Sequence, residues 1–159
     1  MYDCSTCIKG EGMMQTDVFL NGSRADKKQI ETALLAALKF DDRGLIAVAT
    51  SDAKTGMPLM MAYMNAEAVA KTIATGEAHY YSRSRQSLWH KGATSGEVQI
   101  VKAFYVDCDQ DGLWMQVEQK GGGCCHVGYT SCFYRKFDLS QSLDTEKEIA
   151  LTMADISKK

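Results

Sequence analysis

The sequence predicts a single α+β domain in which a mostly antiparallel sheet is flanked by a few helices. Its 159 residues are enough for one domain with a buried core, and 45% of them are hydrophobic. Some segments alternate apolar and polar residues with the period of a strand, whereas others repeat apolar residues with the period of a helix. A single proline in the whole chain argues against linkers and disorder.

The chain is predicted to start with an irregular stretch, residues 1–21, that ends in the turn residues Asn21-Gly22. A helix then follows, because Ser23 or Asp26 can cap it and the pattern continues to Phe40. Its apolar residues recur at helical spacing: Ile30, Leu34, Ala37 and Leu38.

A hairpin and a short helix are predicted next. The hairpin has a buried strand at 45–50, a turn at 52–56 and a second strand at 59–64. Asn65 is a suitable N-cap for the helix, and Gly76 is suited to end it. Val69, Ala70 and Ile73 are predicted to face the core. Residues 78–82 then return as a strand.

The second half of the chain is predicted to begin with a polar loop at 83–96 and to continue with two strands. The first strand carries one face made of Val98, Ile100, Lys102, Phe104 and Val106. The second carries Leu113, Met115 and Val117 on one face. Residues 120–123 are too rich in glycine for a helix, 133–137 form a last strand, and 145–156 form a terminal helix.

These elements predict three regions. They are an N-terminal extension with one helix (1–39), a core (40–137) and a short C-terminal helix or tail (138–159).

Composition and charge exclude several functions. The net charge of −2 gives no general attraction to nucleic acid or acidic membranes. No apolar run reaches 18 residues, so no membrane span is expected. The first ten residues lack the apolar core of a secretory signal. Six cysteines in such a chain predict a reducing compartment, the cytoplasm, where thiols bind metal or perform chemistry more often than they pair.

Cysteines and aspartates gather within a short stretch of the second half, in the segments Asp107-Cys108-Asp109-Gln110-Asp111, Cys125-His126 and Ser131-Cys132-Phe133. Thiolates bind zinc, and carboxylates bind hard ions such as magnesium. Two ligand chemistries interleaved in this way predict a catalytic site with two metals.

The aspartates have two other interpretations. The spacing of Asp107, Asp109, Asp111 and Glu118 matches a calcium loop of the EF-hand type, but the flanking residues do not form helices. A solvated acidic turn is the plain alternative. If the segment is extended, the three aspartates point to one side and Cys108 to the other.

Three thiolates, from Cys108, Cys125 and Cys132, leave the fourth tetrahedral position of a zinc ion open for water. His126, beside one of them, is a candidate proton shuttle or an ordinary loop histidine. Each cysteine alone can instead be a small buried hydrophobe. Cys124 is interpreted as a spectator.

A second cysteine pair lies at the N-terminus, in Cys4-x-x-Cys7. It is interpreted as terminal thiols rather than as half of a structural zinc site or a redox pair.

Cationic and hydroxyl side chains alternate with glycines in the loop at 83–96. Arg83, Arg85 and Lys91 carry the charges, and Trp89 offers a stacking face. Guanidinium groups, backbone amides and hydroxyls are what phosphate groups need. A solvated charged loop is the alternative, but the small residues favour an anionic nucleotide site.

Several separate motifs, in one order, resemble a known family. They are Leu45-Ile46-Ala47-Val48, Met60 through Asn65, Tyr81 through Arg85, Leu88-Trp89 with Lys91-Gly92 and Thr94-Ser95-Gly96, Asp107-Cys108-Asp109 with Asp111, Cys125-His126 with Gly128, and Ser131 through Tyr134. From about residue 40 to 137 the chain is similar to phosphoribosyl-AMP cyclohydrolase. This enzyme of histidine biosynthesis opens the adenine ring of phosphoribosyl-AMP between N1 and C6.

The resemblance implies an enzyme that forms a homodimer, with metal sites at the interface and thiolates drawn from both chains. Implied zinc ligands are Cys108, Cys125 and Cys132, and implied magnesium ligands are Asp107, Asp109 and Asp111. Water activated by zinc would be the nucleophile, and the product would be phosphoribosyl-formimino-aminoimidazole carboxamide ribotide. His126 and Lys91 are the expected catalytic residues. The expected substrate-binding residues are Arg83, Arg85, Trp89, Lys91, Thr94 and Ser95.

The chain departs from the family pattern in three places. Ala93 stands where glutamate is usual, and Tyr81 stands where tryptophan is frequent. The N-terminal 39 residues have no counterpart in the family core. The residues after Phe137 are too few for the pyrophosphohydrolase domain that is often fused, so a monofunctional protein is expected.

Two other functional classes account for only part of the sequence. A zinc deaminase also attacks C6 of adenine, but its His-x-Glu and Pro-Cys-x-x-Cys signature is missing. A metal-sensing module would explain the cysteines and aspartates and leave the basic loop without a role.

Overall fold

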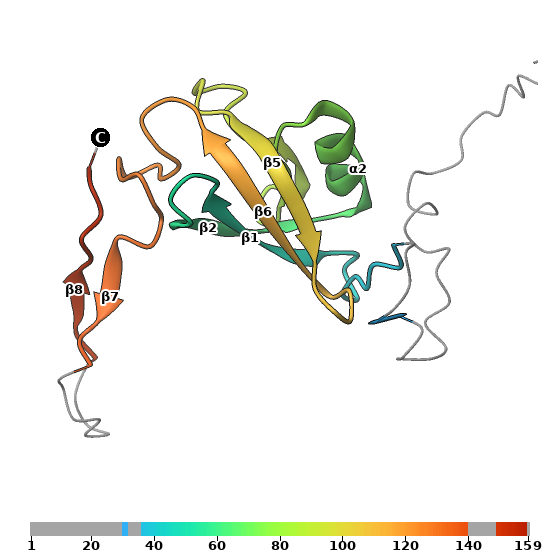
Figure 1. Cartoon of the computed structure of the whole chain (residues 1–159), viewed down its shortest axis with the longest axis horizontal. Helices are drawn as coiled ribbons and strands as arrows, with labels where there is room; N and C mark the ends of the chain where they lie inside the picture. Colours follow the sequence, from blue (N-terminus) through green and yellow to red (C-terminus); the bar gives the residue numbers. More distant parts are fainter. Residues whose placement is uncertain (1–29, 32–35, 140–148, 159) are drawn as a thin grey trace, which may run out of the picture.

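The computed structural model describes residues 30–31, 36–139 and 149–158. They form one domain of the α+β class that is mostly sheet (Figure 1). The elements are β1 (Ile46–Asp52), β2 (Pro58–Met64), α2 (Ala66–Thr75), β3 (His79–Ser82), β4 (Ser87–His90), β5 (Gln99–Val106), β6 (Gly112–Gln119), β7 (Arg135–Phe137) and β8 (Leu151–Met153). No helix in these ranges is long and apolar enough to cross a membrane.

The main sheet has four strands in the order β2-β1-β6-β5. Its outer pairs, β1–β2 and β5–β6, are antiparallel, but the central pair β1–β6 is parallel. The hairpins β3–β4 and β7–β8 form separate two-stranded sheets. The prediction of a mostly antiparallel sheet is therefore confirmed, and the central parallel pair was not foreseen.

The predicted β1–β2 hairpin is confirmed. The Asp52 carboxylate accepts hydrogen bonds from the backbone N–H of Thr55 at 2.8 Å and of Lys54 at 3.1 Å. Gly56, at φ 75°, takes the left-handed conformation that this turn requires. The turn thus sets the register in which β1 and β2 pair.

The predicted helix after this hairpin is also confirmed, as α2. The Asn65 side chain accepts a hydrogen bond from the N–H of Ala68, and Gly76 ends the helix at φ 70°. Val69 is buried as predicted, but Ile73 is 62% exposed and does not face the core. Ile73 lies one turn after Val69, in the last turn of the helix, where its side chain is not covered.

Strand β5 differs from the predicted alternation because it contains a bulge. The pairing with β6 shifts between Val101 and Ala103. Before the bulge Gln99 is fully buried and Val101 is partly buried; after it, Phe104 packs against the core. An extra residue reverses the inward face, so Lys102, predicted to share a face with Phe104, is exposed instead.

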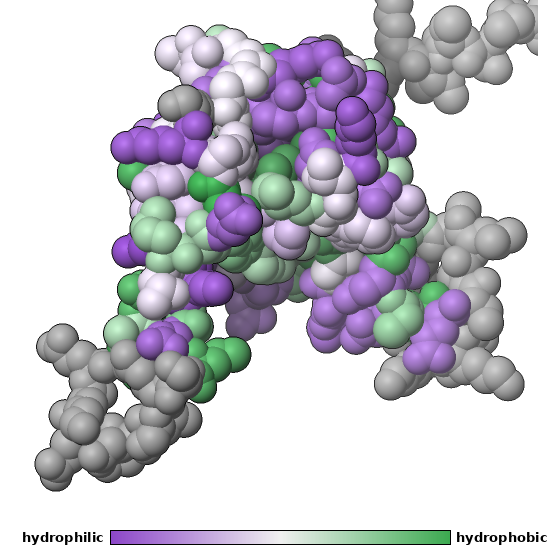
Figure 2. Space-filling model, turned by 60° about the vertical axis from the view of Figure 1, so that its left-hand side comes forward, coloured by the Kyte–Doolittle hydropathy of each residue, from purple (hydrophilic) through white to green (hydrophobic). Residues whose placement is uncertain are grey.

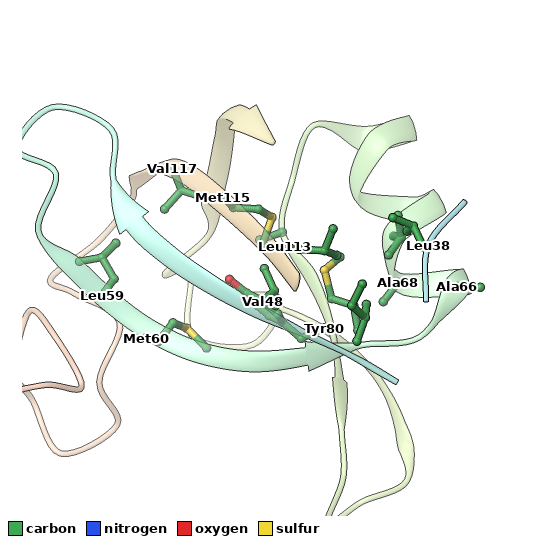
Figure 3. Close-up of a cluster of buried hydrophobic side chains, with 14 of the residues drawn as sticks. Leu38, Val48, Leu59, Met60, Ala66, Ala68, Tyr80, Leu113, Met115 and Val117 are labelled. Atoms are coloured by element: carbon green, nitrogen blue, oxygen red, sulfur yellow. The ribbon is translucent and has the colours of Figure 1, made fainter. Parts of the chain in front are cut away.

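The hydrophobic core lies between one face of the main sheet, helix α2 and β3 (Figure 3). The sheet contributes alternate residues, among them Val48 on β1 and Met115 and Val117 on β6, all 0% exposed. The predicted inward face of β6 is therefore confirmed. Tyr80 reaches this core from β3 and is also 0% exposed.

Three elements differ from the predictions. The loop predicted at 83–96 contains the strand β4, which at four residues is too short to show an alternating pattern. The predicted terminal helix is wrong where the structure describes it, because residues 151–153 form β8. Of the predicted N-terminal helix, residues 30–31 are helical and residues 36–40 are not, and the rest of it lies outside the described residues. A few flanking helices were expected; α2 is the one full helix in the described ranges.

A buried chain of polar side chains crosses the core beside Tyr80. The Tyr80 hydroxyl donates to Gln99 Oε1 at 2.6 Å and lies 2.9 Å from Thr50 Oγ1. Gln99 Nε2 donates to Gln119 Oε1 at 2.9 Å. Burial raises the pKa of Tyr80, so this hydroxyl keeps its proton.

Replacement of Tyr80 by phenylalanine is expected to lower the free energy of unfolding by about 1–3 kcal/mol, because Gln99 Oε1 loses a donor in a dry site. Urea unfolding measures the change. Tyr81→Phe, on the opposite face of the same strand, is the control and should cost less than about 0.5 kcal/mol. Equal losses of unfolding free energy in the two variants would contradict a stabilising role for these buried hydrogen bonds.

Candidate active site

The three aspartates lie together in the turn between β5 and β6. Ligand atoms of Asp107, Asp109 and Asp111 all lie within 4.8 Å of one another, the only such group found among the residues that the structure describes. Asp107 Oδ1 accepts hydrogen bonds from the N–H groups of Asp111 and Gly112, both at 3.0 Å. The segment is a tight turn, so the extended geometry considered for it is wrong, but the carboxylates still converge.

Gln110 holds this turn in place. It is 4% exposed and adopts φ 59°, a left-handed conformation that is uncommon outside glycine. Its side chain accepts from the N–H of Ala37 at 2.6 Å, and its carbonyl accepts from the N–H of Lys39 at 2.7 Å. Sequence reasoning missed Gln110, because nothing in its spacing marks it. Strands flank the turn on both sides, which excludes an EF-hand.

Cys124, Cys125 and Cys132 lie at the opposite end of the main sheet. The N–H of Cys132 donates to the Leu59 carbonyl at 2.8 Å, next to the start of β2. Ser131, fully buried, donates to the Pro58 carbonyl at 2.6 Å and fixes the same loop. Cys125 is 3% exposed and begins a turn closed by the N–H of Gly128. His126 is exposed in this turn.

Cys124, interpreted above as a spectator, lies close to the thiol of Cys132. Its sulfur is 3.9 Å from the Cys132 sulfur and 3.1 Å from the Leu59 carbonyl. The hydrogen bond between the two thiols lowers the pKa of Cys124 and raises that of Cys132. Lys91 is near enough for its positive charge to favour both thiolates.

Cys108 is separated from Cys125 and Cys132 within one chain. It precedes Gly112, which pairs with Ala47 at the start of β1, whereas the other two follow the far end of β6. The partners of Ala47 and Asp52, Gly112 and Val117, are five positions apart along β6, a span of about 17 Å at roughly 3.3 Å per residue. One chain therefore does not bring the three predicted zinc ligands together.

The three basic residues predicted to bind substrate are likewise divided between the two ends of the main sheet. Arg83 and Arg85 lie at the tip of the β3–β4 hairpin, and the Arg83 guanidinium lies 3.9 Å from the ring centroid of Tyr63, at the end of β2. Tyr63 pairs with Ala47, so Arg83 is at the aspartate end. Lys91 follows β4 at the base of the hairpin, at the cysteine end.

Lys91 is buried, with 4% of its surface exposed. Its ammonium group donates to the Glu97 carbonyl at 3.4 Å and lies 6.0 Å from the Trp89 ring centroid. Thr94 and Ser95, in the loop that follows, are exposed, as is Ala93. The roles predicted for these residues stay predictions.

One cluster of ionisable side chains was missed from the sequence. His79 and His90 stack with ring centroids 4.4 Å apart, and His90 Nε2 lies 2.7 Å from a Glu77 carboxylate oxygen. His79 Nδ1 contacts the Glu77 carbonyl at 2.9 Å. The register of β3 with β4 creates this cluster, and the sequence shows that register only if β4 is recognised.

Each end of the sheet thus carries a different set of ligand and ionisable groups. The aspartate end offers three carboxylates for a hard cation, two guanidinium groups for phosphate and the thiol of Cys108. The cysteine end offers two further thiols, an exposed histidine and a buried lysine. Thiol donors suit zinc, and carboxylate donors suit magnesium.

Comparisons with known proteins identify relatives. The family model described as phosphoribosyl-AMP cyclohydrolase matches residues 60–134. The chain is 55% identical over 109 residues to "Phosphoribosyl-AMP cyclohydrolase" of Rhodopseudomonas palustris strain CGA009, which covers 69% of this chain and 72% of the relative. It is 50% identical over 129 residues to the protein of that name from strain HaA2 (81% and 84% covered) and 52% identical over 117 residues to the one from Agrobacterium fabrum (73% and 78%).

Proposed function

Since the chain belongs to the phosphoribosyl-AMP cyclohydrolase family, we propose that it opens the adenine ring of phosphoribosyl-AMP by hydrolysis of the N1–C6 bond, a step in histidine biosynthesis. It acts in the cytoplasm as a homodimer with zinc and magnesium. The observation that carries the proposal is the division of the site, because each end of the main sheet holds a set of groups that the other end lacks.

A two-fold symmetric dimer can complete the site. If the aspartate end of one subunit meets the cysteine end of the other, Cys108 joins Cys125 and Cys132 of the partner subunit. Arg83 and Arg85 then share a cleft with the partner's Lys91 and the partner's His126. Symmetry produces two such sites, each built from both chains.

The metals have fitting donors in this arrangement. Cys125, Cys132 and the partner's Cys108 would hold zinc, and Asp107, Asp109 and Asp111 would hold magnesium. When bound, zinc lowers the pKa of a coordinated water toward neutrality and magnesium neutralises phosphate charge.

The protein's own residues bind the substrate and move protons. Arg83 and Arg85 bind phosphate through paired guanidinium hydrogen bonds, and the Trp89 ring provides a stacking face. Thr94 and Ser95 donate hydroxyl hydrogen bonds to the substrate. The buried ammonium of Lys91 stabilises negative charge that develops near the thiolates.

The hydrolysis balances in atoms and protons. The oxygen of one water bonds to C6, the C6–N1 bond breaks, and C6 becomes the carbon of a carboxamide. One proton of the water goes to N1, which stays in the formimino product, and the other goes to the exocyclic nitrogen on C6, which becomes the NH2 of the carboxamide. His126, exposed beside Cys125, accepts the proton of the water and delivers it toward N1.

Nucleotide binding separates this proposal from a metal-sensing module. Arg83→Met and Arg85→Met together are expected to weaken AMP binding, measured by titration calorimetry, by about tenfold or more, because charge-assisted hydrogen bonds to phosphate are lost. Lys54→Met, in the exposed β1–β2 turn, is the control and should bind AMP normally. A metal-loaded protein that shows no binding of AMP would support a metal-sensing module instead.

A further inference from the structure

The hairpin of β7 and β8 is an arm without a covering partner in the described part of the chain. Every residue of both strands is exposed. The arm extends beside the main sheet and away from it (Figure 1). It carries exposed apolar side chains on both strands and next to them: Phe133, Phe137, Leu139, Ile149, Leu151 and Met153. A two-stranded hairpin alone in water is marginally stable, so this arm needs a surface to pack on.

The base of the arm is fixed to the domain. The N–H of Ala154 donates to the Tyr134 carbonyl at 2.9 Å, and the N–H of Thr130 donates to the Ser157 carbonyl at 3.0 Å. Tyr129 and Tyr134 stack with ring centroids 4.1 Å apart. These contacts lie directly beside Cys132, so the arm leaves the cysteine end of the sheet in a defined direction.

A second exposed apolar surface lies on the main sheet, on the face opposite the core. We call it the outer face: Ala47, Ala49, Met61, Tyr105 and Trp114, which line one open groove with Asp107 at its edge. Met61 is 63% exposed, Tyr105 46% and Trp114 41%, and the last two rings stack at 4.8 Å. Figure 2 shows hydrophobic residues both on the arm and on the body of the domain.

We propose that the arm of one subunit packs into the outer-face groove of a second copy of this chain, and that this exchange builds the dimer. The charges are complementary, because β7 carries Arg135 and Lys136 and the groove has Asp107 at its edge. The inference rests on the proposed function for one further point. An arm seated at the aspartate end carries Cys132, three residues before β7, toward the partner's Cys108.

Photo-crosslinking tests this packing directly. A benzophenone amino acid replaces Phe137 in the full chain, and irradiation should give a covalent dimer on a denaturing gel. Trypsin cuts after lysine and arginine, so the outer face lies on peptides 44–54, 55–71 and 103–120. The crosslink should map to one of these peptides. The same probe at Ile73, which is 62% exposed on α2, should give no such dimer. Crosslinks from residue 137 that stay within one chain, or that join other peptides, overturn the inference.

A variant tests the consequence for assembly. Phe137→Asp with Leu151→Asp should convert the dimer to a monomer in sedimentation equilibrium at micromolar concentration, and bound zinc per chain should fall at least twofold. Met61→Asp, on the other side of the proposed contact, should do the same, whereas Ile73→Asp should remain dimeric. A folded arm variant that stays dimeric contradicts the inference. Turnover of the unmodified protein is measured alongside, so an inactive native enzyme would count against the proposed function and not against the arm.

Discussion

Replacement of Cys125 by serine is expected to abolish turnover and to lower the zinc content of the purified protein. A serine hydroxyl is a much poorer zinc ligand than a thiolate, and Cys125 is nearly isosteric with serine, so the fold should survive. The loss expected is at least about 100-fold in kcat/KM, or roughly 2.7 kcal/mol of transition-state stabilisation. Zinc is measured by atomic emission, and folding by urea unfolding.

Cys124→Ser is the matched control for this variant. Cys124 is the neighbouring residue, is equally buried, and lies 3.9 Å from the Cys132 sulfur, but it is outside the proposed ligand set. Its serine variant keeps a hydroxyl that can donate to the Leu59 carbonyl and should retain zinc and activity. If Cys124→Ser loses zinc and Cys125→Ser does not, the ligand assignment is wrong and Cys124 takes the place of Cys125.

Replacement of Gly92 by alanine is expected to have the largest effect on stability. Gly92 adopts φ +85°, and a Cβ there would lie 2.3 Å from both the Glu97 carbonyl carbon and the Val98 nitrogen. Backbone atoms cannot yield by such a distance without moving the loop, and the Glu97 carbonyl is the acceptor of the Lys91 ammonium. Unfolding free energy should fall by at least about 3 kcal/mol, and turnover should fall with it.

Gly96→Ala separates the clash from the conformational cost. Gly96 has a similar φ of +75°, but no atom lies within 4 Å of the position its Cβ would take. This variant should therefore cost only about 1–2 kcal/mol, the penalty of a left-handed alanine. Equal losses for Gly92→Ala and Gly96→Ala in urea unfolding would show that the close approach of Gly92 to residues 97–98 is unimportant.

Local signals in the sequence predicted the elements that depend on neighbouring residues. The β1–β2 hairpin follows from a short apolar run and the turn at Asp52, and α2 follows from its two caps, Asn65 and Gly76. In both cases the stabilising contacts lie within a few residues in the chain, so their pattern is visible without the fold.

Pairings between distant residues were beyond the reach of such patterns. The parallel pairing of β1 with β6 joins segments about sixty residues apart, and apolar alternation does not specify a partner or a direction. The bulge in β5 is a shift in its pairing with β6, and it reverses the inward face in a way that local alternation does not show. The strand β8, predicted as a helix, owes its conformation to pairing with β7, which overrides local helix propensity.

In the candidate site, too, local sequence patterns were predictive and contacts between distant elements were not. The spacing of Asp107, Asp109 and Asp111 predicted a carboxylate cluster, and the structure brings these three together through a turn. Cys108 and Cys132 are only 24 positions apart, yet a strand and a loop place them at opposite ends of a sheet. Closeness in the sequence therefore did not indicate closeness in space within one chain. The proposed dimer would bring Cys108 together with Cys125 and Cys132 of the partner subunit.

Turnover of phosphoribosyl-AMP by the purified protein, followed by ultraviolet absorbance before and after zinc chelation, tests the central claim most directly. The proposed mechanism predicts hydrolysis that disappears when zinc is removed, returns when zinc is restored, and does not return with magnesium alone. A zinc- and magnesium-loaded protein with no turnover would contradict the proposed activity. Full turnover after complete removal of zinc would contradict the metal that the mechanism assigns to Cys125, Cys132 and the partner's Cys108.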